Sequence, residues 1–364
     1  MGITETAERL TLQFGENYVP VLVGPEIMGR IPERVNRYPH VVLMVGSSAR
    51  ENLSGSIPDF SGINGLLTEI TLNEDINLKN IRNYQKIVKV LIERKVPKES
   101  VIVAVGPQDV LDLAGFVAAT FRGGTRFITV PTTPLAQLSK SVGGVYGLNF
   151  SSSSNTIAAR YFPCEAYLDS IAFSKGDREH LKDYIVELVR LGALKDTSIL
   201  NLLESFADLE ELRKPENLHR LTIRALNLAP QIICRKESEM DPNVFGNSLG
   251  ELITQVWKGP VRYYRLMALS MILESYLADR SGISTRSMME RMRKILEKYS
   301  IDPLRLRDIG QENLMKVFRE AYPDQTSLSI FIPWSSEEKG MVSLSHDRLF
   351  SVMRSYVETY ELSA

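Results

Sequence analysis

Short apolar runs alternate with longer amphipathic stretches in the first part of the chain. Runs rich in β-branched residues occupy residues 18–23, 41–45, 101–105 and 127–130, and residues 81–94 repeat apolar side chains at helical spacing. Short runs of this kind are typical of buried strands, and helices between them connect the strands in parallel. The pattern therefore predicts an α/β domain with a parallel, Rossmann-like βαβ sheet.

The pattern changes after Pro163 to long amphipathic stretches. Apolar residues recur at spacings of three and four, which predicts helices over residues 178–194, 197–212, 250–257, 263–277 and 287–299. A late alternating run at residues 328–334 and 341–344 predicts a small hairpin packed on the helices. Because 364 residues exceed the usual size of one core, we expect two domains. These are a Rossmann-like nucleotide-binding-type domain over residues 1–160 and a mainly α-helical domain over residues 161–364.

Charge and cysteine content narrow the functional classes. The chain has 43 Lys and Arg against 44 Asp and Glu, a formal net charge of -1, so no global field attracts nucleic acid or anionic membranes. Its two cysteines, Cys164 and Cys234, lie far apart, which argues against a disulfide framework and suits a reducing cytosol. No apolar run reaches the length of about 18 residues that a membrane span needs. We expect a cytoplasmic protein that binds a small metabolite, with no nucleic acid and no membrane among its partners.

Residues 130–149 carry the most specific motif of the chain, VPTTPLAQLSKSVGGVYGLN. This segment resembles the PTTLLAQVDSSVGGKTGIN signature of 3-dehydroquinate synthases and related sugar phosphate cyclases. Further similarity to that family runs through residues 103–133, 185–194 and 244–253. The resemblance implies a dehydroquinate-synthase-like fold, with a ligand cleft between a Rossmann-like and a helical domain, and a homodimer.

The resemblance also shows which chemical residues of the family are replaced. The family holds a divalent metal, usually zinc, with a glutamate and two histidines, and these positions fall on Glu187, Asn247 and Tyr263. A neutral amide and a phenol with a pKa of about 10 are poor zinc ligands beside imidazole. We therefore expect that the protein holds no zinc.

Charged residues stand at two further family positions. A catalytic histidine corresponds to Glu251, and a lysine corresponds to Arg190. Glu187 and Arg190 lie in an otherwise apolar helix, so we expect their charges to face inward. Asn247 and Glu251 are four residues apart and share one helix face. The resemblance thus implies Glu251, Glu187 and Arg190 as catalytic residues.

Substrate contacts follow from the same comparison. Ser139 and Val145 replace the family's active-site aspartate and lysine, and Arg122 lies beside the position of a phosphate-contacting arginine. The implied substrate-binding residues are Asn155, Asn247, Tyr263, Arg122 and Ser139.

The cofactor turn differs from the family as well. Where the family has three glycines beside the NAD pyrophosphate, this chain has Gly106, Pro107 and Gln108, which add bulk and remove one N–H donor. The residues that match cofactor-contacting positions are Asp112, Thr132, Thr133, Gly106 and Lys79. The sequence predicts no certain cofactor, and we expect NAD binding to be weak or absent.

Structural interpretations compete with some of these roles. Asp112 also suits the amino-terminal end of a helix, where it would cap the helix and favour its dipole. Gly143, Gly144 and Gly147 are most simply turn residues that need positive φ, and Lys140 is most simply a surface residue.

Three functions remain open. The first is a repurposed, metal-independent enzyme with lyase- or cyclase-type chemistry, acting on a small polar metabolite that is sugar-phosphate-like or cyclitol-like. The second is a catalytically inactive paralogue that binds a metabolite or a partner protein. The third is a 3-dehydroquinate synthase with an unusual active site. The fold alone does not choose among them.

Overall fold

The computed structural model describes residues 7–53, 55–75, 77–150, 153–174, 177–234, 245–257, 260–283, 285–321, 327–331 and 341–362. The chain divides into two compact units. The first unit comprises Met1–Leu181 and Arg213–Cys234, and the second comprises Lys182–Leu212 and Arg235–Ala364. The sequence alone suggested a single boundary at residue 160, whereas the chain enters the second unit, returns to the first and leaves it again.

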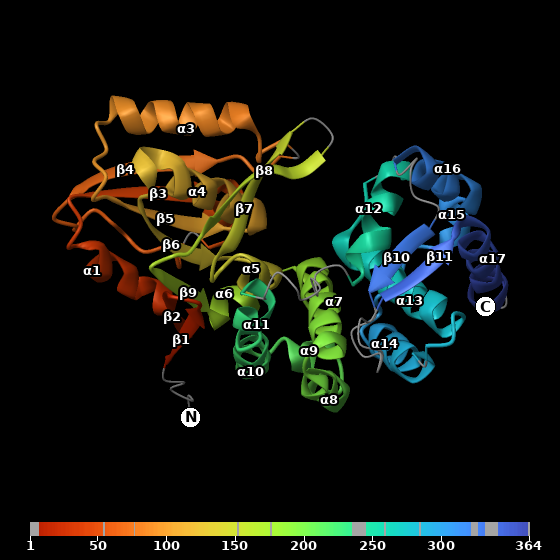
Figure 1. Cartoon of the computed structure of the whole chain (residues 1–364). Coiled ribbons are helices and arrows are strands. Elements are labelled where there is room, and N and C mark those ends of the chain that lie inside the picture. The colour runs from red at the N-terminus through yellow and green to blue at the C-terminus, as the bar shows by residue number, and fades with distance from the viewer. Residues whose placement is uncertain are drawn as a thin grey trace. The chain divides into compact units, whose positions relative to one another are not determined.

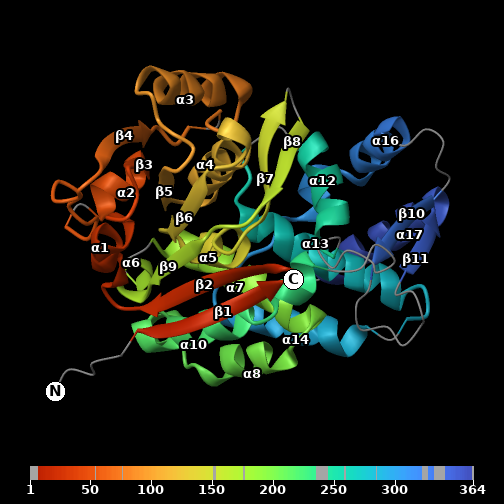
Figure 2. The same ribbon diagram turned by 60° about the vertical axis from the view of Figure 1, so that its left-hand side comes forward.

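A seven-stranded sheet forms the centre of the first unit, in the order β1-β2-β9-β6-β5-β3-β4. Only β1 is antiparallel to its neighbour, and the other neighbouring pairs are parallel. The predicted parallel sheet is therefore confirmed, with β1 and β2 at one edge (Figures 1 and 2). The strands are β1 (Glu8–Phe14), β2 (Asn17–Gly24), β3 (His40–Gly46), β4 (Leu66–Leu72), β5 (Val101–Gly106), β6 (Arg126–Pro131) and β9 (Glu165–Asp169).

Helices connect these strands, and a further hairpin packs on one of them. The hairpin consists of β7 (Gly144–Phe150) and β8 (Ser153–Tyr161), and both strands contact α4. The helical elements of this unit are η1 (Ile27–Arg30), α1 (Ile31–Val35), α2 (Ser47–Asn52), α3 (Ile81–Glu93), α4 (Gln108–Thr120), η2 (Phe121–Gly123), α5 (Pro134–Ser139), α6 (Ser170–Ser174), α10 (Pro215–Leu226) and α11 (Ala229–Ile233).

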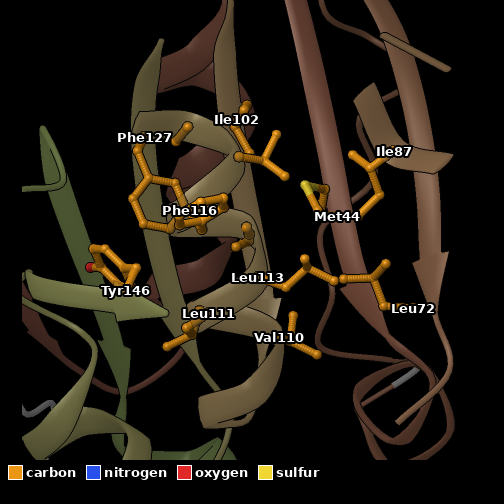
Figure 3. Packing of buried hydrophobic residues seen from close by; sticks show 14 of the residues in the cluster. Met44, Leu72, Ile87, Ile102, Val110, Leu111, Leu113, Phe116, Phe127 and Tyr146 are labelled. Atoms are coloured by element: carbon orange, nitrogen blue, oxygen red, sulfur yellow. The ribbon is translucent and has the colours of Figure 1, made fainter. Parts of the chain in front are cut away.

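The core of the first unit is built around α4. Val110, Leu113 and Phe116 on this helix pack with Met44 and Ile102 of the sheet in one buried cluster (Figure 3). Full burial of such a side chain contributes roughly 1.5–3 kcal/mol. This packing fixes α4 against β5, and so fixes the loop that joins them at the carboxyl end of the sheet.

Gly115 brings the hairpin close to α4. A Cβ atom at this position would lie 2.4 Å from Cγ of Tyr146, a contact that no side chain tolerates. Tyr146 in turn packs edge-on against Phe127 of β6, with ring centroids 5.6 Å apart. The missing side chain of Gly115 therefore lets β7 lie directly on the helix.

Helices make up most of the second unit. They are α8 (Thr197–Ser205), α9 (Leu209–Leu212), α12 (Asn247–Val256), α13 (Tyr263–Asp279), α14 (Arg286–Lys298), α15 (Leu306–Ile309), α16 (Gln311–Ala321) and α17 (His346–Tyr356), followed by the π-helical turn η4 (Val357–Glu361). Helix α7 (Arg178–Leu194) begins at the end of the first unit and continues into the second.

Two predictions for this unit can be compared with the structure. The hairpin is confirmed as β10 (Ser327–Phe331) and β11 (Met341–Ser345), which contact α13 and α17, while residues 332–334 lie outside the described residues. The single helix over residues 197–212 is wrong. Phe206 leaves α8 in an extended conformation, and the Asp208 carboxylate then accepts the N–H of Glu211 at 2.9 Å, which starts α9. Across the described residues, no helix is both long and apolar enough to cross a membrane.

Candidate functional site

Two lysines flank a buried aspartate in the first unit. Asp112 lies in the second turn of α4 and is 1% exposed. Nζ of Lys79 lies 2.6 Å from Oδ2 of Asp112, and Nζ of Lys140 lies 2.9 Å from Oδ1. The interpretation of Asp112 as a helix cap is wrong, because Pro107 holds the N-cap position. The interpretation of Lys140 as a surface residue is wrong as well, because its side chain is only 19% exposed and pairs with Asp112.

Asn155 completes this group from strand β8. Its side-chain oxygen accepts a hydrogen bond from Lys79 at 2.8 Å, while its own backbone N–H donates to the side chain of Asn149 at 3.1 Å. Asn155 has a φ of 52°, in the left-handed region, where asparagine is more frequent than most residues. We call Lys79, Asp112, Lys140 and Asn155 the lysine–aspartate cluster.

The glycines beside this cluster have two different roles. Gly143 and Gly144 have φ values of 103° and 107°, so the predicted positive-φ turn is confirmed there. Gly147 is different, because it lies within β7 and is not among the positive-φ glycines. A Cβ atom on Gly147 would lie 2.9 Å from Cβ of Asn155. Gly147 therefore allows Asn155 to approach β7, and the turn interpretation is wrong for this residue.

Lys140 also lies beside Val145, which stands at the position of the family's active-site lysine. Nζ of Lys140 donates to the backbone carbonyl of Val145 at 2.9 Å. The Val145 side chain itself is 43% exposed. An ammonium group is thus present next to this position, but it comes from a residue five places earlier in the chain.

The turn after β5 is crowded and internally hydrogen-bonded. A Cβ atom on Gly106 would lie 2.6 Å from the side chain of Val110, so Val110 fills the space beside this glycine. Pro107 has no N–H to offer a phosphate. Nε2 of Gln108 donates to the hydroxyl of Ser139 at 2.7 Å. These groups bind one another across the turn, which is a poor match for a backbone cradle that holds a pyrophosphate.

The two threonines after β6 also have local partners. The backbone N–H of Thr132 donates to the carbonyl of Gly106 at 3.0 Å. Thr133 is the N-cap of α5, where its hydroxyl accepts the N–H of Ala136 at 3.3 Å. The structure therefore brings the predicted cofactor residues to one end of the sheet, with these threonines in structural roles.

Arg122 lies at the other end of α4. Its Nε donates to the carbonyl of Val96 at 2.9 Å, and its guanidinium lies over the ring of Phe121. Because a 13-residue helix is about 20 Å long, Arg122 is separated from the lysine–aspartate cluster by most of the length of α4.

A second charged group lies in the second unit, on α7 and α13. Nε and Nη2 of Arg190 donate to the two carboxylate oxygens of Glu187 at 2.9 and 2.7 Å. The hydroxyl of Tyr263 donates to Oε2 of Glu187 at 3.0 Å. Glu187 and Arg190 are 7% and 4% exposed, which confirms that these charges face inward. We call these three residues the Glu187–Arg190–Tyr263 triad.

The tyrosine of the triad acts as a hydrogen-bond donor. Burial is the main cause that raises the pKa of Tyr263 well above its ordinary value of 10, and the charge of Glu187 raises it further. The phenol therefore keeps its proton at neutral pH. The triad holds one positive charge, one negative charge and a neutral hydroxyl.

Sequence reasoning missed Glu274, which is completely buried on α13. Its carboxyl oxygens accept the backbone N–H groups of Gly246 at 2.7 Å and Leu249 at 3.1 Å, at the start of α12. Burial raises the pKa of Glu274 to about 8, against the opposing effects of these hydrogen bonds and of Arg190. The available signal was one carboxylate within the otherwise uncharged run of residues 267–278.

Helix α12 carries two predicted site residues. Asn247 is its first residue and is half-buried, and Glu251 lies one turn later and is exposed. The N-cap of the helix is Gly246, whose φ of 80° suits glycine. Because Glu274 binds the N–H groups of Gly246 and Leu249, it fixes the position from which Asn247 and Glu251 project.

Comparisons with known proteins agree with this architecture. The family model described as 3-dehydroquinate synthase N-terminal matches residues 69–183. The 3-dehydroquinate synthase of Thermoplasma volcanium is 28% identical over 313 residues, which cover 85% of this chain and 86% of the relative. The chain is thus similar to 3-dehydroquinate synthases over most of its length.

Two solved synthase structures share the fold. A 2-deoxy-scyllo-inosose synthase complexed with carbaglucose-6-phosphate, NAD+ and Co2+ has a TM-score of 0.82 at 15% identity, covering 96% of this chain and 99% of that one. The 2-epi-5-epi-valiolone synthase of Streptomyces hygroscopicus subsp. jinggangensis, with NAD+ and Zn2+ bound, has a TM-score of 0.77 at 16% identity, covering 95% and 99%. These likenesses confirm the predicted dehydroquinate-synthase-like fold.

The residues that match the family's metal ligands do not have the chemistry of a zinc site. Both oxygens of Glu187 already accept hydrogen bonds from Arg190, and Tyr263 presents a protonated hydroxyl instead of an imidazole lone pair. Asn247 offers only a neutral amide. Within the part of the chain that the structure describes, no group of three or more His, Cys, Asp or Glu side chains is placed to hold a metal ion.

Proposed function

We propose that this cyclase-family chain is a metal-independent enzyme that acts on a small polar metabolite, sugar-phosphate-like or cyclitol-like. The observation that carries the proposal is the Glu187–Arg190–Tyr263 triad. At positions that match metal ligands in the family, a guanidinium neutralises the glutamate that a metal ion would otherwise neutralise. A fixed organic cation thus replaces a bound inorganic one.

The triad supplies a positive charge and a hydroxyl donor in surroundings of low dielectric constant. Such groups stabilise negative charge that develops on a substrate oxygen, and they do so without the reorganisation that water requires. Arg190 is the group we assign to this role, with Tyr263 as a neutral donor beside it. Glu187 accepts hydrogen bonds on both oxygens, so we assign it as a positioning residue for Arg190.

Glu251 is the residue we assign as the general acid and base. Its carboxyl group is exposed on α12, so it can receive a proton from a substrate and return it without first breaking an ion pair. Glu274 supports this role indirectly, because it holds the first turn of the same helix.

The lysine–aspartate cluster supports recognition of an anionic substrate. Two ammonium groups flank the buried carboxylate of Asp112, Lys79 also lies 3.8 Å from the exposed carboxylate of Asp109, and Asn155 is exposed beside them. Ammonium groups donate charge-assisted hydrogen bonds to phosphate and carboxylate groups. We assign Lys79, Lys140 and Asn155 to this binding role.

NAD has a poor site in this proposal. The turn at Gly106 is crowded by Val110 and lacks the N–H that Pro107 has removed. When NAD binds to a family member it supplies hydride-transfer chemistry. We infer that here NAD binds weakly or not at all.

One observation favours a second candidate, a catalytically inactive paralogue. The polar groups of the triad hydrogen-bond to one another, as expected for a site that has become purely structural. In that case the buried charges would contribute to the fold of the second unit alone.

The experiment compares Glu251→Gln with Glu297→Gln, an exposed control on α14. A panel of sugar phosphates and cyclitols is screened by thermal shift and by mass spectrometry of products, with and without a chelator. We expect turnover that resists the chelator, falls at least 100-fold in Glu251→Gln and is unchanged in the control, with equal stability of all proteins.

Other outcomes decide between the alternatives. Turnover that yields 3-dehydroquinate and stops with the chelator would identify a metal-dependent synthase with an unusual site. No turnover with any compound, together with unchanged ligand binding in Glu251→Gln, would identify the inactive paralogue.

A further inference from the structure

A pocket of about 380 Å³ opens at the edge of the sheet in the first unit. Its lining residues come from strands β1, β2 and β9 and from the segment of η1, α1 and the residues just after α1. Four arginines line it together with a buried glutamate and a buried tyrosine: Arg9, Arg30, Arg34, Arg37, Glu165 and Tyr167. No residue of the lysine–aspartate cluster contributes to the pocket.

The sheet register brings part of this lining together. Arg9 of β1 pairs with Leu22 of β2, and Leu22 pairs with Tyr167 of β9. Residues that are paired across neighbouring strands project to the same face, and so does Glu165, two residues before Tyr167. Arg9, Leu22, Tyr167 and Glu165 therefore lie on one face of the sheet. This face presents a guanidinium group, the apolar surfaces of Leu22 and Tyr167, and a carboxylate.

Helical spacing brings the other arginines to the same place. Arg30, Arg34 and Arg37 follow one another at intervals of four and three along η1, α1 and the residues just after it. Side chains at these intervals lie on one side of a helix. All three line the pocket, so this side faces the row on the sheet.

Glu165 uses only part of this positive charge. It forms an ion pair with Arg34 and accepts the hydroxyl of Tyr167 at 2.8 Å. Burial alone would raise the pKa of Glu165, but the hydrogen bonds from Arg34 and Tyr167 outweigh burial and lower it. Glu165 is therefore ionised, and Nη2 of Arg37 lies 4.0 Å from its Oε1.

Arg9 and Arg30 have no such partner. Among the described residues, neither guanidinium takes part in a hydrogen bond or an ion pair, although both line the pocket. The remaining carboxylate at the pocket is the exposed Glu33. Four positive groups against two negative ones leave an excess of two positive charges.

We propose that this arginine pocket binds a small phosphorylated metabolite through its phosphoryl group. A phosphomonoester carries a charge of about −1.5 to −2 at pH 7, which matches the excess. Planar guanidinium groups bind phosphate oxygens in pairs, which a lysine cannot do. The volume lies within the range of roughly 300–1,000 Å³ that small-molecule pockets have, and Leu22 and Tyr167 give the rest of the molecule an apolar wall.

Isothermal titration calorimetry of the full chain with inorganic phosphate at constant ionic strength tests the proposal. The key variant is Arg9→Gln/Arg30→Gln, which removes the two unpartnered guanidinium groups. The control is Arg82→Gln/Arg94→Gln, two exposed arginines of α3 and its C-cap with the same change of charge. We expect saturable binding, weakened at least tenfold in the first variant and changed less than twofold in the control.

Lys140→Met separates this site from the lysine–aspartate cluster. If phosphate binds in the arginine pocket, its saturable binding is weakened in Arg9→Gln/Arg30→Gln and kept in Lys140→Met. Phosphate binding that is lost only in Lys140→Met, or that does not saturate in the unmodified protein, would overturn the proposal. Circular dichroism checks the fold of each variant, and Arg30→Gln alone replaces the double variant if that does not fold.

Discussion

The two charged groups of this protein differ in the number of cations that face the buried carboxylate. In the lysine–aspartate cluster of the first unit, two ammonium groups share the carboxylate of Asp112. In the triad of the second unit, Glu187 has one cationic partner, Arg190, and a neutral one, Tyr263. Lys79 also lies 3.8 Å from the exposed carboxylate of Asp109, so the charges balance in both groups. The difference lies in the number of cationic partners of the buried carboxylate, two for Asp112 and one for Glu187.

The two groups should lose different amounts of stability when one cation is removed. A buried charge that loses its only partner destabilises a protein strongly, because the desolvated charge is left uncompensated. A buried charge with two partners keeps one of them after a substitution. Removal of one cation should therefore harm the second unit far more than the first.

The largest expected effect is that of Arg190→Met. This change keeps much of the aliphatic stem but leaves the buried carboxylate of Glu187 with a phenol alone, so we expect a loss of about 3–5 kcal/mol in the free energy of unfolding. Chemical denaturation measures it. Arg291→Met is the control, because the Arg291–Glu204 pair is 28% and 42% exposed and should cost at most about 1 kcal/mol. A loss below 1 kcal/mol in Arg190→Met would mean that the triad is not an essential ion pair.

The next effect concerns Glu274 and pH. Its folded-state pKa of about 8 lies above the ordinary value of 4.5, so the folded state binds the proton more tightly than the unfolded state. The resulting stability is fully present below pH 4.5 and is lost as the pH rises through 8. Between pH 5.5 and 7.5 the loss should be roughly 2 kcal/mol.

Glu274→Gln isolates this dependence. A glutamine does not titrate, so the variant should show a flatter stability profile between pH 5.5 and 7.5. It should also start about 1 kcal/mol lower, because its amide nitrogen cannot accept one of the two N–H groups at the start of α12. Parallel pH profiles of the two proteins would show that Glu274 does not titrate in this range.

The sequence predicts helices and strands better than it predicts which side chains and backbone groups contact one another. Helix α7 agrees with its predicted range of residues 178–194, and the strand at residues 41–45 is confirmed as β3 (His40–Gly46), because local periodicity determines both. Glu274 was missed because its partners are backbone N–H groups 25 and 28 residues earlier in the chain. The β7–β8 hairpin was also missed, since it depends on the missing side chain at Gly115 of another element.

The candidate site shows the same limit. Alignment of motifs brought Glu187, Arg190 and Tyr263 into one hypothesis, and the structure places them in direct contact. The role of Lys140 could not be predicted in this way, because Lys140 matches no charged position of the family and its partner Asp112 lies 28 residues away in the chain. The interactions that decide the chemistry are those between distant segments, which a single sequence does not encode in any local pattern.

The smallest expected effect is that of Lys140→Met on stability. Asp112 would keep Lys79 at 2.6 Å, so its charge would remain compensated, and we expect a loss of at most about 1 kcal/mol in the free energy of unfolding. The control is Lys89→Met, which removes an exposed i,i+4 pair with Glu93 and should have almost no effect. Affinity for an anion that binds at the lysine–aspartate cluster should fall about tenfold in Lys140→Met and stay unchanged in the control, because the ammonium beside Val145 is lost. If Lys140→Met instead destabilised the protein as much as Arg190→Met, then both lysines would be needed to bury Asp112. Asp112 would then depend on both of its cationic partners, and the contrast between the two groups would fail.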